Sequence, residues 1–108
     1  MITVLVVGAS AAALVSPAGE DPSIEVMTAA GTEETLEKLA RNRRIDAVLL
    51  LGDGEPAATA AAIHEEDPGA PPLFVPASVA APPRVRTIDA ASPAGLLHAI
   101  AHELSAEG

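Results

Sequence analysis

One stretch decides the fold of this chain: Arg44-Ile45-Asp46-Ala47-Val48-Leu49-Leu50-Leu51-Gly52-Asp53-Gly54. Its apolar residues, Ile45 and 47–51, do not alternate with polar ones, which predicts a short strand covered by helices on both faces. The strand ends in the turn signal Gly52-Asp53-Gly54, and a helical segment with Pro56 near its start follows. A strand that leads through a Gly-rich turn into a helix is typical of a βαβ array, in which ligands bind beyond the carboxyl ends of the strands.

Further apolar runs predict four more strands, at residues 2–7, 24–29, 73–75 and 85–88. Helices are predicted at residues 11–15, 33–42, 57–66 and 93–105, with Ser10 as N-cap of the first and Ser92-Pro93 opening the last. Right-handed crossovers between parallel strands then give an α/β fold, an open parallel sheet of five strands with helices on both faces. We expect a single domain that spans residues 1–108.

The helix at 33–42 carries the clearest signal in the chain. Thr32 is its expected N-cap, and the pairs Glu34–Lys38 and Glu37–Arg41 have the favourable i,i+4 order. Its expected buried stripe is Leu36, Leu39 and Ala40. The last helix is expected to turn a second apolar stripe to the core, made of Leu96, Leu97, Ile100 and Leu104.

Composition excludes several classes of function. The chain has 108 residues and no cysteine, which excludes disulfides, thiolate metal sites and cysteine nucleophiles and fits a reducing compartment. Its 15 acidic and 6 basic residues give a net charge of −9, which disfavours direct binding to nucleic acid. The apolar segment 2–15 has no basic residue before it and is too short to span a bilayer, so we expect neither secretion nor a membrane anchor, and a cytoplasmic location.

Four segments make the chain resemble a response-regulator receiver domain, the flavodoxin-like signalling module of two-component systems. They are residues 2–7 (ITVLVV), 26–36 (VMTAAGTEETL), 45–51 (IDAVLLL) and 92–100 (SPAGLLHAI). The resemblance implies a three-layer sheet in the strand order 2-1-3-4-5. The segment between the fourth and fifth strands is too short for the fourth receiver helix, which we expect to be missing.

The site residues of the receiver family are absent at the matching positions. The family binds Mg²⁺ with an acidic pair after the first strand, where this chain has Gly8 and Ala9, which offer no oxygen ligand. The position of the phosphorylated aspartate is Leu51, which is no nucleophile. Asp53 lies two residues further on, and we interpret it as a turn residue that caps the next helix; the alternative is a displaced phosphoacceptor.

Two further elements of the family's site are altered. The Thr or Ser after the fourth strand falls near Ala77 or Ser78, so at most that hydroxyl survives, and the Lys after the fifth strand falls on Asp89, a reversal of charge. Without metal or Lys, nothing neutralises charge on a transferring phosphoryl group. The degenerate site edge is therefore Gly8, Ala9, Asp53, Ser78 and Asp89, and we expect no catalysis, no metal and no cofactor.

Other chemistry finds little support in the sequence. Ser10 lacks the second glycine of a nucleophile elbow, and no phosphate-binding glycine motif occurs. His98 and His102 have the i,i+4 spacing of metal ligands, but they lie opposite the apolar stripe of their helix, so a solvated face is the simpler interpretation. His64 is expected at the surface near a helix end.

The sequence therefore predicts a pseudo-receiver that acts by protein–protein contact and not by phosphotransfer. A homodimer is one option, through the last helix and the Pro-rich connection at 76–83, because loss of the fourth helix should leave Phe74 and its neighbours partly exposed. The alternative is a small-molecule or anion-binding domain that uses the strand edge at Gly8, Ser10, Gly52 and Asp53.

Overall fold

The computed structural model describes residues 2–9, 24–42, 44–52, 55–66, 69–89 and 93–107. Five parallel strands form one sheet, and they are β1 (Ile2–Val7), β2 (Ile24–Ala29), β3 (Ala47–Leu50), β4 (Leu73–Pro76) and β5 (Arg86–Ile88). The described helices are α2 (Thr32–Arg41), α3 (Pro56–Glu66) and α4 (Pro93–Glu107). The strand order is β2-β1-β3-β4-β5, which confirms the predicted topology. The predicted helix at 11–15 and its expected N-cap Ser10 lie outside the described residues.

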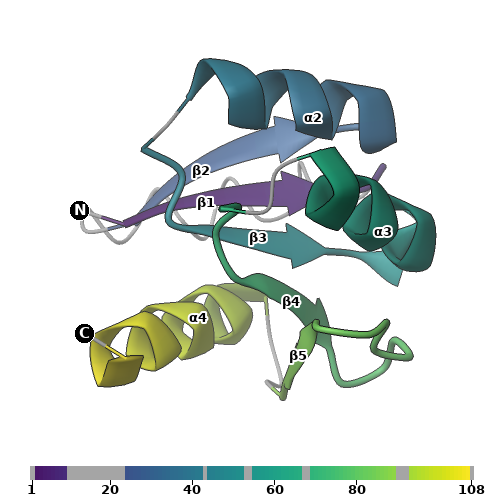
Figure 1. The fold of residues 1–108 in the computed structure, drawn as a ribbon. Helices are drawn as coiled ribbons and strands as arrows, with labels where there is room; N and C mark the ends of the chain where they lie inside the picture. The colour runs from purple at the N-terminus through teal and green to yellow at the C-terminus, as the bar shows by residue number, and fades with distance from the viewer. Residues whose placement is uncertain are drawn as a thin grey trace.

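The helices cover both faces of the sheet, with α2 and α3 on one side and α4 on the other (Figure 1). The arrows of β1, β2 and β3 point the same way in this view, and α2 and α3 each lead the chain back to the start of the next strand. This arrangement follows from the apolar runs of the central strands β1 and β3, because a strand without alternation needs cover on both faces. None of the described helices is long and apolar enough to cross a membrane.

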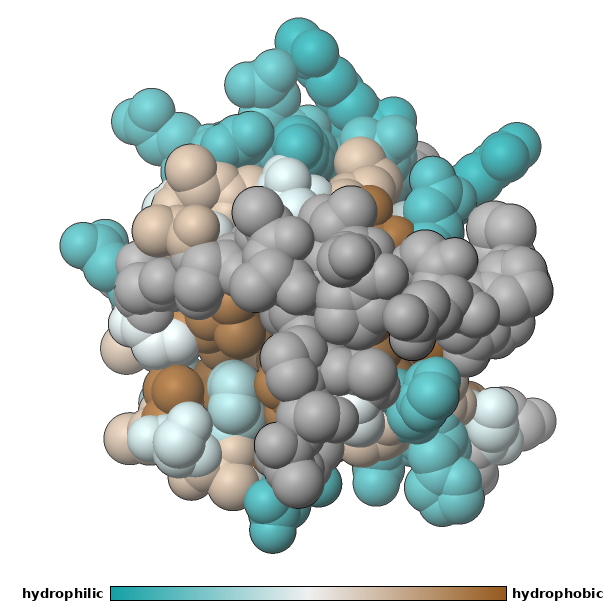
Figure 2. All heavy atoms as spheres, turned by 180° about the vertical axis from the view of Figure 1, so that it is seen from behind, coloured by the Kyte–Doolittle hydropathy of each residue, from teal (hydrophilic) through white to brown (hydrophobic). Residues whose placement is uncertain are grey.

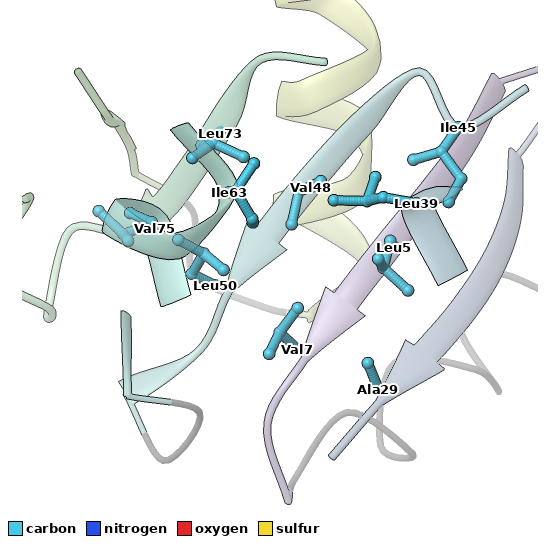
Figure 3. Packing of buried hydrophobic residues seen from close by; sticks show 11 residues of the cluster. Leu5, Val7, Ala29, Leu39, Ile45, Val48, Leu50, Ile63, Leu73 and Val75 are labelled. Atoms are coloured by element: carbon cyan, nitrogen blue, oxygen red, sulfur yellow. The ribbon is translucent and has the colours of Figure 1, made fainter. Parts of the chain in front are cut away.

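Successive residues of one strand serve two separate cores. Val48 and Leu50 of β3 pack toward α2 and α3, whereas Leu49 packs toward α4. Figure 3 shows the first core, in which side chains of the sheet meet Leu39 of α2 and Ile63 of α3. Buried members of the second core are Val4, Val6, Ile24, Ala47, Leu49, Leu51, Phe74, Ile88, Leu97 and Ile100. Since Leu97 and Ile100 belong to it and Leu96 and Leu104 pack against it, the predicted stripe of α4 is confirmed.

The expectation that Phe74 and its neighbours are partly exposed is wrong. Phe74 and Val75 are fully buried and Leu73 is 2% exposed. Phe74 points to the α4 side of the sheet, which the missing helix would not have covered. On the other side, Val79 and Val85 of the connection pack against the core that contains Leu73 and Val75.

The connection from β4 to β5, residues 77–85, is fully described and contains turns but no helix. The prediction that the fourth receiver helix is missing is therefore confirmed for this segment. A turn in this connection closes with the Val79 N–H donating to the Pro76 carbonyl at 2.9 Å.

Figure 2 shows the molecule from behind. On this face, apolar side chains reach the surface in several small areas next to hydrophilic side chains.

Two details of α2 differ from the prediction. The N-cap is Gly31 and the helix begins at Thr32, whose hydroxyl instead meets the Thr59 hydroxyl of α3 at 2.9 Å. Ala40 is exposed, and Thr35 takes the buried position, with its hydroxyl donating to the Gly31 carbonyl at 2.7 Å. A buried threonine is stable there because this local hydrogen bond satisfies its polar atom.

Candidate functional site

The carboxyl edge of the sheet brings the sequence-predicted site residues together. Gly8 follows β1, Ser78 lies two residues after β4, and Asp89 follows β5. Backbone hydrogen bonds continue the sheet here, since the Gly8 N–H donates to the Ala29 carbonyl at 2.9 Å and the Ala77 N–H to the Ile88 carbonyl at 2.8 Å. Because all five strands are parallel, these residues share one edge, where flavodoxin-like and related sheets bind ligands. Asp53 and Ser10 lie outside the described residues.

Gly8 occupies a backbone conformation that favours glycine. Its φ is 142°, a region that residues with a Cβ rarely adopt, and it is buried. An aspartate at this position would have to be held in a strained conformation before it offered an oxygen to a cation. Ala9, the next residue, is exposed and carries only a methyl group. The first strand therefore ends without a metal ligand at either position.

Leu51 is a core residue and not an edge residue. It is 9% exposed, and it belongs to the cluster that also contains Phe74 and Leu97. Its backbone N–H donates to the Val7 carbonyl at 2.9 Å, so the chain at this point is still paired with β1. A side chain at position 51 is thus directed into packed apolar surroundings.

The loop after β4 lies against the end of β3. A Cβ atom added at Gly52 would meet the Val79 Cγ2 atom at 3.4 Å, an ordinary van der Waals contact. This valine therefore covers part of the edge that a ligand of the strand ends would have to approach. Ser78 and Asp89 nearby are exposed and open to solvent.

Known proteins support the fold but not a family. No protein-family model matches the sequence, and a search of curated proteins finds no match. A chain in the crystal structure of the phosphorylated P1 domain of CheA3 in complex with CheY6 from R. sphaeroides is 17% identical, with a TM-score of 0.71 over 96% of this chain and 97% of that chain. The fold is flavodoxin-like. At this level of identity, the similarity concerns the arrangement of the chain alone.

An acidic depression lies at the same edge of this flavodoxin-like sheet, and sequence reasoning missed it. Its volume is about 450 Å³, and its lining is Ala30, Gly31, Thr32, Glu33, Glu34 and Glu55. Glu55 has a φ of 50°, a left-handed conformation that the sequence does not signal, and its carbonyl accepts the Thr59 N–H at 2.9 Å to start α3. Among the described residues, no group of three His, Cys, Asp or Glu side chains is arranged to hold a metal ion.

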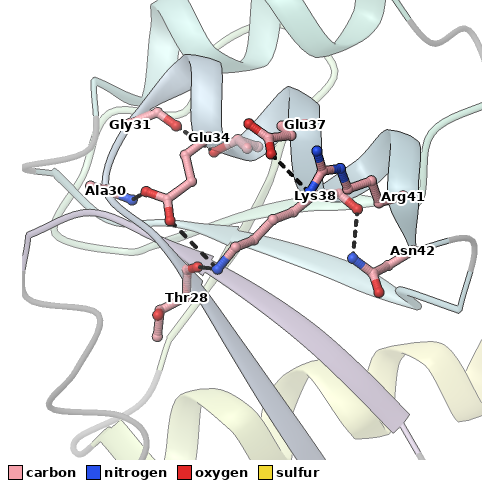
Figure 4. Close-up of polar contacts among 9 residues, drawn as sticks. Thr28, Ala30, Gly31, Glu34, Glu37, Lys38, Arg41 and Asn42 are labelled. Carbon is pink, nitrogen blue, oxygen red and sulfur yellow. Dashed lines mark hydrogen bonds and ion pairs between the residues drawn. The ribbon is translucent and has the colours of Figure 1, made fainter.

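A polar network holds the start of α2 to the end of β2 beside this depression (Figure 4). The Glu34 carboxylate accepts the Ala30 N–H at 2.8 Å and lies 3.5 Å from the Lys38 ammonium, which also donates to the Thr28 carbonyl. The backbone hydrogen bond from Ala30 is the main reason that the pKa of Glu34 is lowered from its usual value, and the Lys38 charge adds to it. The second predicted pair, Arg41 with Glu37 at 3.2 Å, is also present.

All three histidines were expected at the surface, and two of them lie there. His98 and His102 are exposed on α4, as predicted. His64, expected at the surface, is half-buried in α3, and its Nε2 atom is shielded from water without a hydrogen-bond partner among the described residues. It lies beside Ile63, which is fully buried, so the helix end packs more closely against its neighbours than its charged sequence indicates.

Proposed function

We propose that this chain is a pseudo-receiver: a non-catalytic signalling module, related in fold to two-component proteins, that acts by binding another protein. The observation that carries the proposal is the burial of Leu51. The position at which receivers are phosphorylated is here 9% exposed and packed in the core. We infer that the domain does not receive a phosphoryl group there.

The remaining edge supports the same conclusion from electrostatics. A phosphoryl group in transfer needs cations around it, and receivers supply a metal ion and a lysine. Here Gly8 and Ala9 offer no metal ligand, and Asp89 carries a negative charge at the matching lysine position. We propose that the domain is not an enzyme and uses no metal or cofactor.

The alternative anion-binding function is not favoured by the described part of the edge. The depression there is lined by Glu33, Glu34 and Glu55, whose charges repel an anion at neutral pH. The homodimer loses its main argument, since the exposed apolar patch around Phe74 is not present. We therefore propose a different protein as the partner, with the cytoplasm as the expected location.

Intact-mass spectrometry after incubation with acetyl phosphate and Mg²⁺ tests the proposal. We expect no added phosphoryl mass, while a conventional receiver domain in the same tube is modified. A stable, Mg²⁺-dependent adduct that disappears in Asp53→Asn would refute the proposal, because it would make Asp53 the acceptor. An adduct that persists in Asp53→Asn but disappears on mutation of another residue would refute it equally.

A further inference from the structure

A concave surface lies at the amino edge of the sheet, opposite the degenerate site. One depression of about 290 Å³ is lined by Leu39, Asn42, Ile45, Asp46, Gly69, Pro71 and Pro72. A second, of about 370 Å³, is lined by Thr3, Glu25, Arg44 and Asp46. Because Asp46 lines both, they adjoin each other, and we name them together the Asp46 cleft.

The first depression is apolar at its base. Leu39 and Ile45 are 5% and 6% exposed, and the two prolines Pro71 and Pro72 are half-buried beside them. Pockets for drug-sized molecules have volumes of about 300–1,000 Å³. With about 290 Å³, this depression is at the lower limit, which suits one long side chain of a partner better than a cofactor.

Asp46 is held in place by backbone hydrogen bonds. Its Oδ2 atom accepts the Thr3 N–H at 2.8 Å, and its own N–H donates to the Thr3 carbonyl at 2.8 Å. Thr3 is in register with Glu25 on the neighbouring strand β2. The carboxylates of Glu25 and Asp46 therefore lie on either side of the start of β1. The second oxygen of Asp46 keeps its capacity to accept a hydrogen bond from a ligand.

Among the described residues that line the cleft, two carboxylates stand against one cation, so the balance of charge favours a positively charged ligand. The carboxyl end of α2 leads into the cleft at Asn42, and the partial negative charge of this helix end is offset in part by Lys38 and Arg41 in the last turn. The Asn42 amide donates to the Lys38 carbonyl at 3.0 Å, which leaves its oxygen as a further acceptor. Among the described lining residues there is one cation, Arg44, and it forms no ion pair with Glu25 or Asp46.

We propose that the Asp46 cleft is a docking site for a lysine side chain of a protein partner. The aliphatic stem of lysine would lie on Leu39 and Ile45, and its ammonium would reach Asp46. Arginine suits the site less well, because a guanidinium prefers both oxygens of a carboxylate and the Thr3 N–H already occupies one. The net charge of −9 also attracts a basic partner at long range.

This inference rests on the proposed function, since it names one surface through which the module would bind its partner. The two can fail separately. A phosphoryl adduct would overturn the proposed function and leave the binding result untouched. Absence of lysine binding would overturn only the assignment of the surface.

A titration followed by ¹H–¹⁵N NMR tests the site, with N-acetyl-lysine methylamide as the probe and N-acetyl-norleucine methylamide as its uncharged control. We expect the lysine probe to shift the amides of Thr3, Ile45 and Asp46, and the norleucine probe to shift them much less. Asp46→Asn keeps an oxygen for the Thr3 N–H but removes the charge, and should weaken binding about fivefold, the effect of one partly exposed ion pair.

Asp89→Asn is the matched control, because it removes the same charge from the opposite edge and should change binding less than about twofold. Glu25→Gln leaves the Thr3 hydrogen bond untouched and should weaken binding about twofold, so it serves if Asp46→Asn fails to fold. Equal binding in wild type and in the Asp46 and Glu25 variants overturns the proposal. Shifts spread evenly over Glu33, Glu65 and other surface carboxylates overturn it as well.

Discussion

Placing an aspartate at position 51 should destabilise the domain strongly and should not create a phosphoacceptor. Leu51 is 9% exposed in the α4 core. Removing a buried leucine side chain costs about 2–5 kcal/mol, and burying a polar group without a partner costs about 1–3 kcal/mol more. Leu51 is at the end of β3 and retains slight exposure, so we take the lower end of each range. The free energy of unfolding of Leu51→Asn should therefore be about 3 kcal/mol below that of wild type.

Leu51→Asp adds the cost of a charge to that loss. Burial in apolar surroundings raises the pKa of an introduced carboxyl above its unfolded value, so the excess cost is present at neutral pH. It disappears as the pH falls below the unfolded pKa, where the carboxyl is protonated in both states. Leu51→Asp should therefore be less stable than Leu51→Asn by at least about 1 kcal/mol at pH 7, and equal to it in acid.

Urea unfolding of wild type, Leu51→Asn and Leu51→Asp, followed by circular dichroism at several pH values, measures these differences. A domain of this size has a total stability of about 5–15 kcal/mol, so the aspartate variant could be largely unfolded. If Leu51→Asp lay within about 0.5 kcal/mol of wild type, position 51 would be open to solvent and the reasoning would be refuted. Mg²⁺-dependent stabilisation of Leu51→Asp would refute it in a second way.

Three further predictions concern the backbone, a carboxylate and a histidine. Gly8→Ala should lose about 1–3 kcal/mol in urea unfolding, because its φ of 142° strains any residue with a Cβ; an unchanged midpoint would contradict this. The pKa of Glu34 is lowered in the folded state, so its stabilisation is present above the unfolded pKa and is lost as the pH falls through the folded pKa. Glu34→Gln should therefore flatten the acid limb of the stability curve, which urea unfolding at several pH values measures. His64→Leu should raise the free energy of unfolding by about 1 kcal/mol, because it removes a shielded nitrogen without a partner, and the exposed His102→Leu should not; thermal unfolding of both variants tests this.

The strands were predictable from sequence because their signal is simple. Unbroken apolar runs such as residues 47–50 occur in few other settings, and the turn after them fixes the direction of the chain. The faces of individual side chains were harder. Phe74 was expected on the face left open by the missing helix, but the alternation of β4 turns its side chain toward α4. The pairing of Phe74 with Leu49 of β3 determines this face, and the sequence alone does not give that pairing.

Side-chain hydrogen bonds explain most of the other errors. Thr32 has the composition of an N-cap, yet its hydroxyl pairs with Thr59 of another helix, 27 residues away in the chain. Thr35 is buried because the Gly31 carbonyl satisfies it, which no hydrophobic pattern indicates. That positions 8 and 9 carry no oxygen-bearing side chain is visible in the sequence alone. The Asp46 cleft could not be predicted from it, since segments from four parts of the chain form this cleft.

The burial of Leu51 also constrains how this chain can evolve. A phosphorylatable domain would need an acceptor at position 51, carboxylates at positions 8 and 9, and a lysine at position 89. The first two changes meet a packed core and a glycine backbone, so each is expected to destabilise the domain before the others give it any activity. Single substitutions toward a phosphorylation site at these positions are therefore expected to lower the stability first, whereas substitutions on the outer surface meet neither of these two constraints.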